Sequence, residues 1–303
     1  MLDFLFVHWN VDPVIFHIGS FGLRWYSIGF LIAFALGYYI MYRMFKREKI
    51  DVDYLDSMIV YIFLATLIGA RLGHCFFYQP DYFLTGDHWL EIFLPIDIRT
   101  GQFTGYEGLA SHGAAIGILI ALWLYYRRYG MNPIWFLDRL VIVVALGGAF
   151  VRLGNLMNSE IYGVETSLPW GFIFEQNHET VAKHPTQLYE SLSYFIIFVV
   201  CLLVYRHRKG QLRVGVLFGW WLIALFGVRF IIEYVKEEQV AFEQGMFLDM
   251  GQLLSIPFIL LGVVMVVLGY RMKFPQEPFI AKQMKVIEAK KKEKESNKKA
   301  KKK

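Results

Sequence analysis

Long apolar runs alternate with short polar segments along the chain. About seven runs hold close to 20 residues each, the length at which an α-helix crosses the roughly 30 Å hydrocarbon core of a bilayer. They are Gly22–Tyr42, Ser57–Tyr78, Leu109–Tyr126, Leu137–Leu156, Leu188–Tyr205, Val214–Tyr234 and Gln252–Tyr270. The pattern predicts an all-α, polytopic membrane protein with about seven transmembrane helices. The second, fourth and sixth spans are weaker by hydropathy because each carries an Arg or a Glu.

Basic residues gather at alternate ends of these runs. Lys and Arg cluster after the first, third, fifth and seventh runs, whereas the segments near 79–108, 159–185 and 236–249 are acidic or aromatic. Cytoplasmic loops of membrane proteins carry the excess of Lys and Arg. We therefore expect the N-terminus outside and the C-terminus in the cytoplasm, which requires an odd number of spans.

The chain divides by composition into a membrane part and a basic tail. Residues 1–271 are expected to form one transmembrane domain with long outer loops at about 79–108 and 159–185. The segment Arg271–Lys303 holds 13 basic and 4 acidic residues, a low-complexity composition typical of a disordered tail. Such a tail, 272–303, is expected to be cytoplasmic and drawn to anionic membrane lipids. No nucleic-acid partner is expected, because no aromatics alternate with the final lysines.

The N-terminal residues and the cysteines complete this picture. Before the first run there is no basic region and no small-residue cleavage site, so we do not expect a removable signal peptide. An amphipathic segment at the outer interface is predicted instead by four aromatic residues, Trp9, Phe16, Phe21 and Trp25. The chain has 2 cysteines, Cys75 and Cys201, in separate apolar runs. We expect buried thiols rather than a disulfide or a metal site.

Charged residues inside the spans need an explanation, because each costs about 2.5–3.5 kcal/mol at the bilayer centre. Arg152 and Asn155 share a helix face at the outer end of the fourth span. A guanidinium there suits a phosphate ligand, although an interfacial Arg that reaches outward is the simpler alternative. Arg229 and Glu233 are four residues apart in the sixth span. They form either a self-neutralised pair or, with Arg152, an anion site.

Two histidine-containing segments open further spans. His112 is followed by Gly113 and other small residues, which would leave room for a ligand beside its ring. An imidazole with a pKa near 6.5 suits proton abstraction at neutral pH, although a lone His at a helix start is often structural. The segment 183–190 brings Gln187, Tyr189 and Glu190 into a helix at lipid depth, where these side chains need partners.

Taken in order, these motifs resemble one known family over nearly the whole chain. The motifs are Asp12–Phe16, Trp25-Tyr26, Arg71-Leu72-Gly73, His112-Gly113, Arg152–Gly163, His184–Glu190, Arg229 with Glu233, and Met250–Ser255. They are similar to those of the prolipoprotein diacylglyceryl transferases of bacterial inner membranes. The segment Arg152–Gly163 matches the family signature, which is quite specific.

The resemblance implies a function and a set of site residues. Members transfer an sn-1,2-diacylglyceryl group from phosphatidylglycerol to the lipobox cysteine of a prolipoprotein signal peptide, the first step of lipoprotein biosynthesis. The product is a thioether and the leaving group a glycerol phosphate; no cofactor or metal is implied. The implied catalytic residues are His112, Arg152 and Arg229, and the implied substrate-binding residues are Tyr26, Asn155, Glu160, Gly163 and Glu233.

The sequence also departs from the family pattern. Val151 and Ser159 stand where the signature usually has Gly, and two alanines follow Gly113 in place of Gly-Leu. Leu225 occupies the position of an important family tyrosine, one helical turn before Arg229, so that role cannot be carried over. Tyr234 or Tyr189 could replace its hydroxyl. The competing function is a small-solute or lipid transporter with a buried Arg/Glu site, which would need a polar path to both sides.

Overall fold

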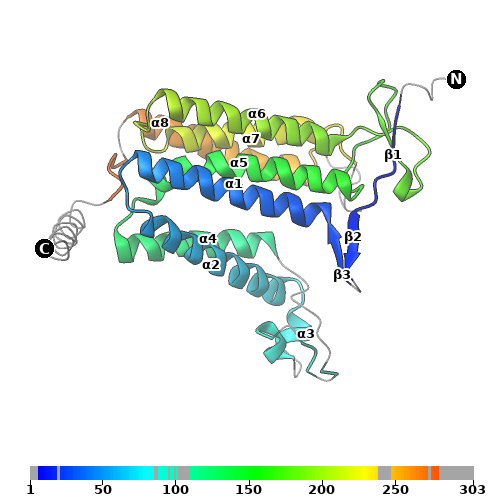
Figure 1. Cartoon of the computed structure of the whole chain (residues 1–303), viewed down its shortest axis with the longest axis horizontal. Coiled ribbons are helices and arrows are strands. Elements are labelled where there is room, and N and C mark those ends of the chain that lie inside the picture. Colours follow the sequence, from blue (N-terminus) through cyan, green and yellow to red (C-terminus); the bar gives the residue numbers. More distant parts are fainter. Residues whose placement is uncertain are drawn as a thin grey trace, which may run out of the picture. The chain divides into compact units, whose positions relative to one another are not determined.

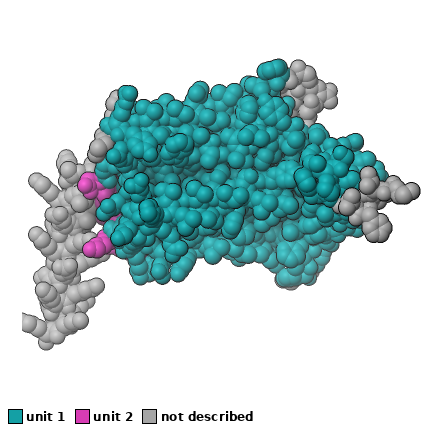
Figure 2. Space-filling view, turned by 90° about the horizontal axis from the view of Figure 1, so that it is seen from above, with its two compact units in different colours: residues 1–48, 134–276 teal, residues 49–133, 277–303 magenta. Residues whose placement is uncertain are grey.

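The computed structural model describes residues 6–18, 21–84, 88–94, 96–98, 100–101, 110–237, 247–271 and 274–279. Two compact units emerge: unit 1 holds residues 1–48 and 134–276, and unit 2 holds residues 49–133 and 277–303. Figure 2 colours them separately. The predicted tail after residue 279 lies outside the described residues, and the predicted domain limit at 271 stays a prediction.

Helices dominate both units, as the apolar pattern predicts. Unit 1 contains α1 (Trp25–Arg47), α5 (Pro133–Met157, its first residue belonging to unit 2), α6 (Thr186–His207), α7 (Val216–Glu233) and α8 (Met250–Tyr270). Unit 2 contains α2 (Asp53–Phe77), the short α3 (Pro80–Leu84), η2 (Trp89–Ile92) and α4 (Ser111–Tyr129).

Six of the described helices are long and apolar enough to cross a membrane: α1, α2, α5, α6, α7 and α8. The third predicted span, Leu109–Tyr126, corresponds to α4, which is not one of these six. The most apolar helix, α8, has a mean hydropathy of 2.5, yet only 22% of that apolar stretch is buried within the chain. A helix so apolar and so exposed requires an apolar solvent. The direction of insertion stays a prediction.

In unit 1 the five long helices run side by side (Figure 1). The ring of Tyr194 on α6 packs over Gly148 of α5. The hydroxyl of Ser191, also on α6, donates to the Ala149 carbonyl at 2.9 Å. Helices α7 and α8 approach so closely at Gly219 and Gly262 that an added Cβ on either glycine would lie 2.7 Å from the other's carbonyl oxygen. Small residues thus set the helix spacing, as is usual in membranes.

A buried ion pair closes the end of unit 1 where α1 and α6 finish. Arg139 donates to both carboxylate oxygens of Glu48, at 3.1 and 2.8 Å, and to the Gly210 carbonyl at 3.0 Å. The hydroxyl of Tyr205 donates to the same Glu48 at 2.8 Å. Arg139 belongs by sequence to the basic cluster that follows the third apolar run, but its side chain is buried, with the residue 2% exposed. It fastens helix ends together.

The start of α7 is capped from a distance. Both carboxylate oxygens of the buried Asp138 on α5 accept backbone N–H groups, from Gly215 at 2.7 Å and Phe218 at 2.8 Å. A carboxylate at this position accepts hydrogen bonds from backbone N–H groups that have no partner within the helix, and its negative charge is stabilised by the positive end of the helix dipole. Asp138 thereby fixes α7 against α5.

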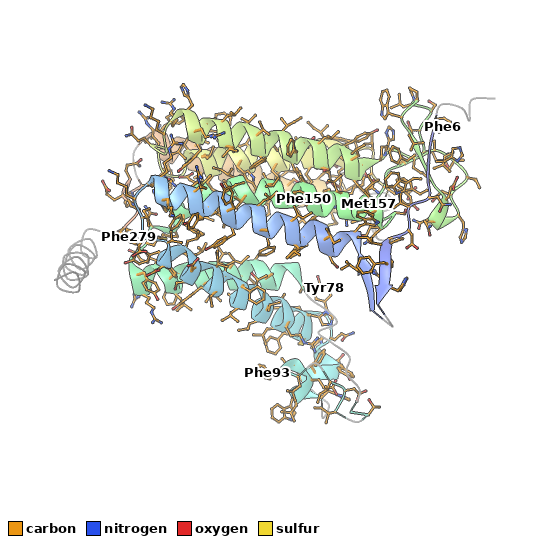
Figure 3. The ribbon with its side chains drawn as sticks, in the orientation of Figure 1. Phe6, Tyr78, Phe93, Phe150, Met157 and Phe279 are labelled. Atoms are coloured by element: carbon orange, nitrogen blue, oxygen red, sulfur yellow. The ribbon has the colours of Figure 1, made fainter. Side chains whose placement is uncertain are left out.

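Short strands flank the opposite end of unit 1, which we call the site end. Strand β1 (Val7–Trp9) pairs in parallel with β4 (Phe172–Phe174), and β2 (Val14–Ile18) forms an antiparallel hairpin with β3 (Phe21–Arg24). Figure 3 marks this end by Phe150 and Met157 on the last turns of α5. The predicted N-terminal amphipathic segment therefore contains strands, which the all-α pattern did not indicate.

Unit 2 is built on close contact between α2 and α4. A Cβ added to Gly113 would lie 2.1 Å from the carbonyl oxygen of Gly69, and one added to Gly117 would lie 2.2 Å from that of Ala65. Both glycines after His112 thus serve helix packing, which accounts for them without a ligand. Cys75 is buried in this unit, and Cys201 is buried in unit 1; both are free thiols, as expected.

Candidate active site

Arg152 occupies the last turns of α5 and is held at two points. Its Nε lies 2.7 Å from Oε2 of Glu190 on α6, and its Nη1 donates to Oδ1 of Asn155 at 3.2 Å. The side chain is 14% exposed, so this guanidinium is not one that extends freely into water. The hydroxyl of Tyr194 on α6 also contacts this guanidinium. The guanidinium is therefore fixed in orientation.

Asn155 connects Arg152 to Glu160. The amide of Asn155 donates to Glu160 Oε1 at 2.7 Å, and Asn158 donates to the same oxygen at 3.3 Å. The turn that brings Glu160 back toward α5 contains Ser159 at φ +52° and Ile161 at φ +61°. Both lie in the left-handed region of backbone conformation, which residues other than Gly seldom adopt. Glu160 itself is exposed and orients Arg152 only through Asn155.

Glu190 is a fully buried carboxylate between two cations. Besides Arg152, the ammonium of Lys236 lies 3.6 Å from its Oε1. Glu190 is 0% exposed and Lys236 is 7% exposed. The 2.7 Å contact with Arg152 has the distance of an ion pair but not the alignment of a hydrogen bond, and neither Glu190 oxygen accepts one from a described residue. Both carboxylate oxygens of Glu190 can therefore still accept hydrogen bonds.

Glu233 pairs with Lys236 and not with Arg229. The Lys236 ammonium lies 3.5 Å from Glu233 Oε2, just after α7 ends. An added Cβ on Gly251 at the start of α8 would lie 2.3 Å from the Glu233 carboxyl carbon, so this side chain packs against α8. No described acidic side chain forms an ion pair with Arg229. The self-neutralised pair of Arg229 and Glu233 considered above is therefore not formed.

Tyr194 lies near the charged side chains of the site. This residue is one helical turn after Glu190 on α6, is 5% exposed, contacts Arg152 and is close enough to Arg229 to feel its charge. A buried hydroxyl near the arginines therefore comes from a different helix than the one expected. Tyr189, one of the two candidates named from sequence, instead accepts the indole N–H of Trp170 at 2.9 Å and contacts His184 Nδ1 at 3.1 Å.

Tyr26 and Gly163 are explained by packing within the site. A Cβ on Gly154 would lie 2.3 Å from the Tyr26 ring, so the aromatic ring rests on α5 next to Asn155. A Cβ on Gly163 would lie 2.1 Å from the Val235 carbonyl oxygen, and the Gly163 N–H donates to the His184 carbonyl at 2.8 Å. Gly163 thus lets the segment after α5 approach the end of α7.

The connection before α6 holds a second charged group. Lys183 contacts Glu237 and lies 3.7 Å from Glu179. Burial alone would lower the pKa of Lys183, but the hydrogen bond and charge of Glu237 outweigh it and raise that pKa. His184 behaves oppositely: burial lowers its pKa, so the imidazole is neutral at pH 7. These residues brace the site rather than enter it.

Not every residue predicted for the site lies among the side chains described so far. His112 lies in the first turn of α4 in unit 2, and its side chain is outside the described residues. Arg71, also in unit 2, donates from Nη2 to the Glu91 carbonyl at 2.6 Å and from Nε to the Ile92 carbonyl at 3.3 Å. Arg71 therefore fastens the loop after α2. Among the described residues, no three His, Cys, Asp or Glu side chains converge as metal ligands.

Sequence reasoning missed Lys236 and Tyr194. Lys236 is three residues after Glu233, but it follows the apolar run and resembles an ordinary charged loop residue. Tyr194 lies within an apolar span that contains other aromatic residues, so nothing in the sequence distinguishes it. Glu190 was recognised as costly without partners, and the structure supplies Arg152 and Lys236. The available signal was spacing: Gln187, Glu190 and Tyr194 recur at intervals of three and four on one helix face.

Comparison with known proteins identifies the family of this chain. The family model "Prolipoprotein diacylglyceryl transferase" matches residues 13–268. Curated relatives named phosphatidylglycerol–prolipoprotein diacylglyceryl transferase include those of Tolumonas auensis (44% identity, 88% of this chain and 98% of the relative) and Bacteroides fragilis (42%, 86% and 94%). The relative from Cupriavidus pinatubonensis is 34% identical over 88% of this chain and 94% of its own length. This chain belongs to the prolipoprotein diacylglyceryl transferase family and is a multi-pass membrane transferase.

Proposed function

We propose that the site end of unit 1 transfers the diacylglyceryl group of phosphatidylglycerol to a prolipoprotein cysteine at the bacterial inner membrane. In this reaction the thiol sulfur attacks the glycerol carbon that bears the phosphate. A C–S bond forms and the C–O bond to phosphate breaks, the electron pair leaving with the phosphate oxygen as glycerol phosphate. The thiol proton passes to a base. The family supports the activity, and the residues below support the mechanism.

The proposal rests on how Arg152 and Arg229 are held in the site. Glu190 and Asn155 hold Arg152 by Nε and Nη1, and this fixed guanidinium is the one we assign to a phosphate oxygen. Arg229 has no ion-pair partner among the described carboxylates. Together they offer the phosphate one oriented guanidinium and one that no described carboxylate neutralises. Charge fixed in a low-dielectric site stabilises a leaving group more than flexible charge does.

The carboxylates keep these cations in place. Glu190 fixes Arg152 directly, Glu160 fixes it through Asn155, and Glu233 holds Lys236 near Glu190. The ion pairs also remove most of the cost of placing several charges near a membrane. We assign these side chains to positioning. Tyr194 supplies a buried hydroxyl that contacts Arg152, and we propose that it serves where the family tyrosine is replaced by Leu225.

His112 remains our proposal for the base. A cysteine thiol with a pKa near 8.5 is only a few per cent ionised at pH 7, so proton removal limits the attack. A neutral imidazole has the required affinity for protons. The His112→Gln variant tests this role, and turnover at the wild-type rate would remove His112 from the chemistry.

The proposed function is tested by mixing purified protein with phosphatidylglycerol and a synthetic lipobox peptide. Mass spectrometry should detect a diacylglyceryl adduct on the cysteine, and glycerol phosphate should appear in equal amount. A peptide with Ser in place of the lipobox Cys, and phosphatidylcholine in place of the donor, are the matched controls. An unmodified peptide, under conditions in which a Bacteroides fragilis relative modifies it, would refute the proposal.

A further inference from the structure

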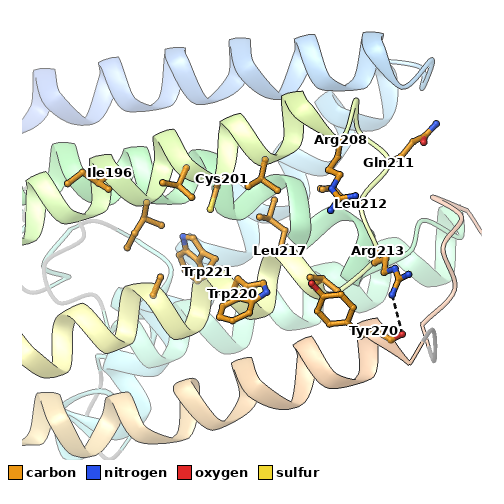
Figure 4. Close-up of a pocket in the computed structure, with 15 residues that line it drawn as sticks. Ile196, Cys201, Arg208, Gln211, Leu212, Arg213, Leu217, Trp220, Trp221 and Tyr270 are labelled. Atoms are coloured by element: carbon orange, nitrogen blue, oxygen red, sulfur yellow. Dashed lines mark hydrogen bonds between the residues drawn. The ribbon is translucent and has the colours of Figure 1, made fainter.

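A groove lies between α6 and α7 at the end of unit 1 opposite the site. Its volume is about 670 Å³. The walls are apolar side chains of both helices, and the mouth is formed by the connection between them together with Tyr270 at the end of α8 (Figure 4). Arg208 stands 18 residues after Glu190 on a continuous helix and its cap, which is about 27 Å along the axis. The groove is therefore separate from the proposed active site.

The groove has the dimensions of one leaflet. Its lining extends on α6 from Ile196 to the Arg208 cap, about 18 Å at 1.5 Å per residue. Half of a hydrocarbon core is about 15 Å. Val200 is 53% exposed and Trp220 is 52% exposed, so the walls open sideways, where a bilayer would supply acyl chains. An extended hydrocarbon chain fits this shape better than a compact solute.

Positive charge marks the mouth. Figure 4 shows Arg208 and Arg213 at the same end of the groove, with Trp220 and Trp221 further along α7. Arg213 donates to the Tyr270 carbonyl at 3.4 Å, whereas Arg208 is exposed and pairs with no described carboxylate. The nearby Glu48 is already neutralised by Arg139. An apolar channel that ends in basic side chains matches a lipid with an anionic head group.

We propose that this groove binds one anionic glycerophospholipid, with an acyl chain along α6 and α7 and the head group at Arg208 and Arg213. The lipid is a lasting partner of the helix pair and not the diacylglyceryl donor. It fills an apolar surface that the chain leaves uncovered and joins α6 to the neighbouring end of α8. The site thus goes beyond the proposed transferase function.

Native mass spectrometry of the full-length protein in detergent tests this site. The probes are dioleoylphosphatidylserine, which is anionic, and dioleoylphosphatidylcholine, which is not. We expect wild-type protein to retain one phosphatidylserine with about fivefold preference, the effect of one basic side chain near an anionic head group. Arg208→Gln should lose this preference, whereas Arg206→Gln, also exposed in the same turn, should keep it.

Filling the groove tests the acyl-chain contact independently of charge. Ala224 is exposed on the lining and eight residues into α7, so Ala224→Phe should reduce retention of both lipids at least fivefold. Val263→Phe, at similar depth on α8 and outside the lining, should leave retention unchanged. Arg229→Gln should also retain the lipid, since it lies at the other end.

Three results would overturn the proposal. Equal retention by Ala224→Phe and wild type would place the lipid elsewhere. Equal losses in Arg206→Gln and Arg208→Gln would indicate diffuse surface charge instead of a defined head-group site. A stoichiometric protein released with the chain from native membranes, in place of lipid, would identify the groove as a helix-docking surface.

Discussion

Replacing Glu190 by Gln removes one charge from the centre of the site and keeps the side chain's size. Glu190 is fully buried, 2.7 Å from the Arg152 Nε and 3.6 Å from the Lys236 ammonium. Removing one partner of a buried ion pair typically costs about 3–5 kcal/mol. We expect about 3 kcal/mol, because Lys236 keeps Glu233 at 3.5 Å and the new amide can still accept a hydrogen bond.

The loss in activity should exceed the loss in stability. Arg152 would lose the contact that fixes its Nε and, with the Asn155 contact at Nη1 remaining, could rotate away from the phosphate. A displacement near 1 Å, or the loss of one oriented donor, lowers turnover about 10²-fold or more. The turnover number for lipobox peptide modification, measured with saturating phosphatidylglycerol, reports this effect. Thermal unfolding of the same preparation reports stability.

Glu237→Gln is the matched control for this variant. Glu237 also pairs with a lysine, Lys183, but its side chain is 39% exposed. Exposed pairs contribute about 0–1 kcal/mol, so this variant should keep nearly normal turnover and stability. If Glu190→Gln behaved like Glu237→Gln in both assays, the buried carboxylate would not position Arg152.

Three further predictions concern neighbouring side chains. Tyr194→Phe should lower turnover about tenfold or more with little change in the Michaelis constant, because the buried hydroxyl contacts Arg152; Tyr234→Phe, at an exposed position, is the control and should be neutral. Ser159→Gly should raise the free energy of unfolding by about 1 kcal/mol, since φ is +52° and the buried hydroxyl accepts or donates no hydrogen bond among described residues; an unchanged melting temperature would contradict this. Burial lowers the pKa of His184, so the unfolded chain binds the proton more tightly; stability should fall as the pH drops below about 6.5, and His184→Gln should remove this slope in melting temperature against pH.

The apolar pattern predicted the helices well because a bilayer imposes both length and composition on each span. The predicted run Leu188–Tyr205 is α6 (Thr186–His207), and Leu137–Leu156 is α5 (Pro133–Met157). The strands β1 and β4 were not predicted, since each has only three residues and their pairing joins segments far apart in the chain. Local periodicity contains no information on such a contact.

Residue types in the site were predictable, but their pairing was not. Helical spacing placed Arg229 and Glu233 on one face and suggested a pair. In the structure α7 ends at Glu233, and the chain then returns Lys236 to that carboxylate. Tyr194 was overlooked because the family comparison directed attention to α7, whereas the hydroxyl comes from α6. Partner choice depends on how helices pack, which a single sequence does not specify.

The central claim is that Arg152 binds the departing phosphate as an oriented guanidinium. A lysine cannot keep the Glu190 and Asn155 contacts while also presenting a donor to the phosphate. The most direct measurement is therefore the turnover number of Arg152→Lys for diacylglyceryl transfer to the lipobox peptide. We predict a loss of at least about 10²-fold in folded protein, whereas turnover equal to wild type would contradict the account.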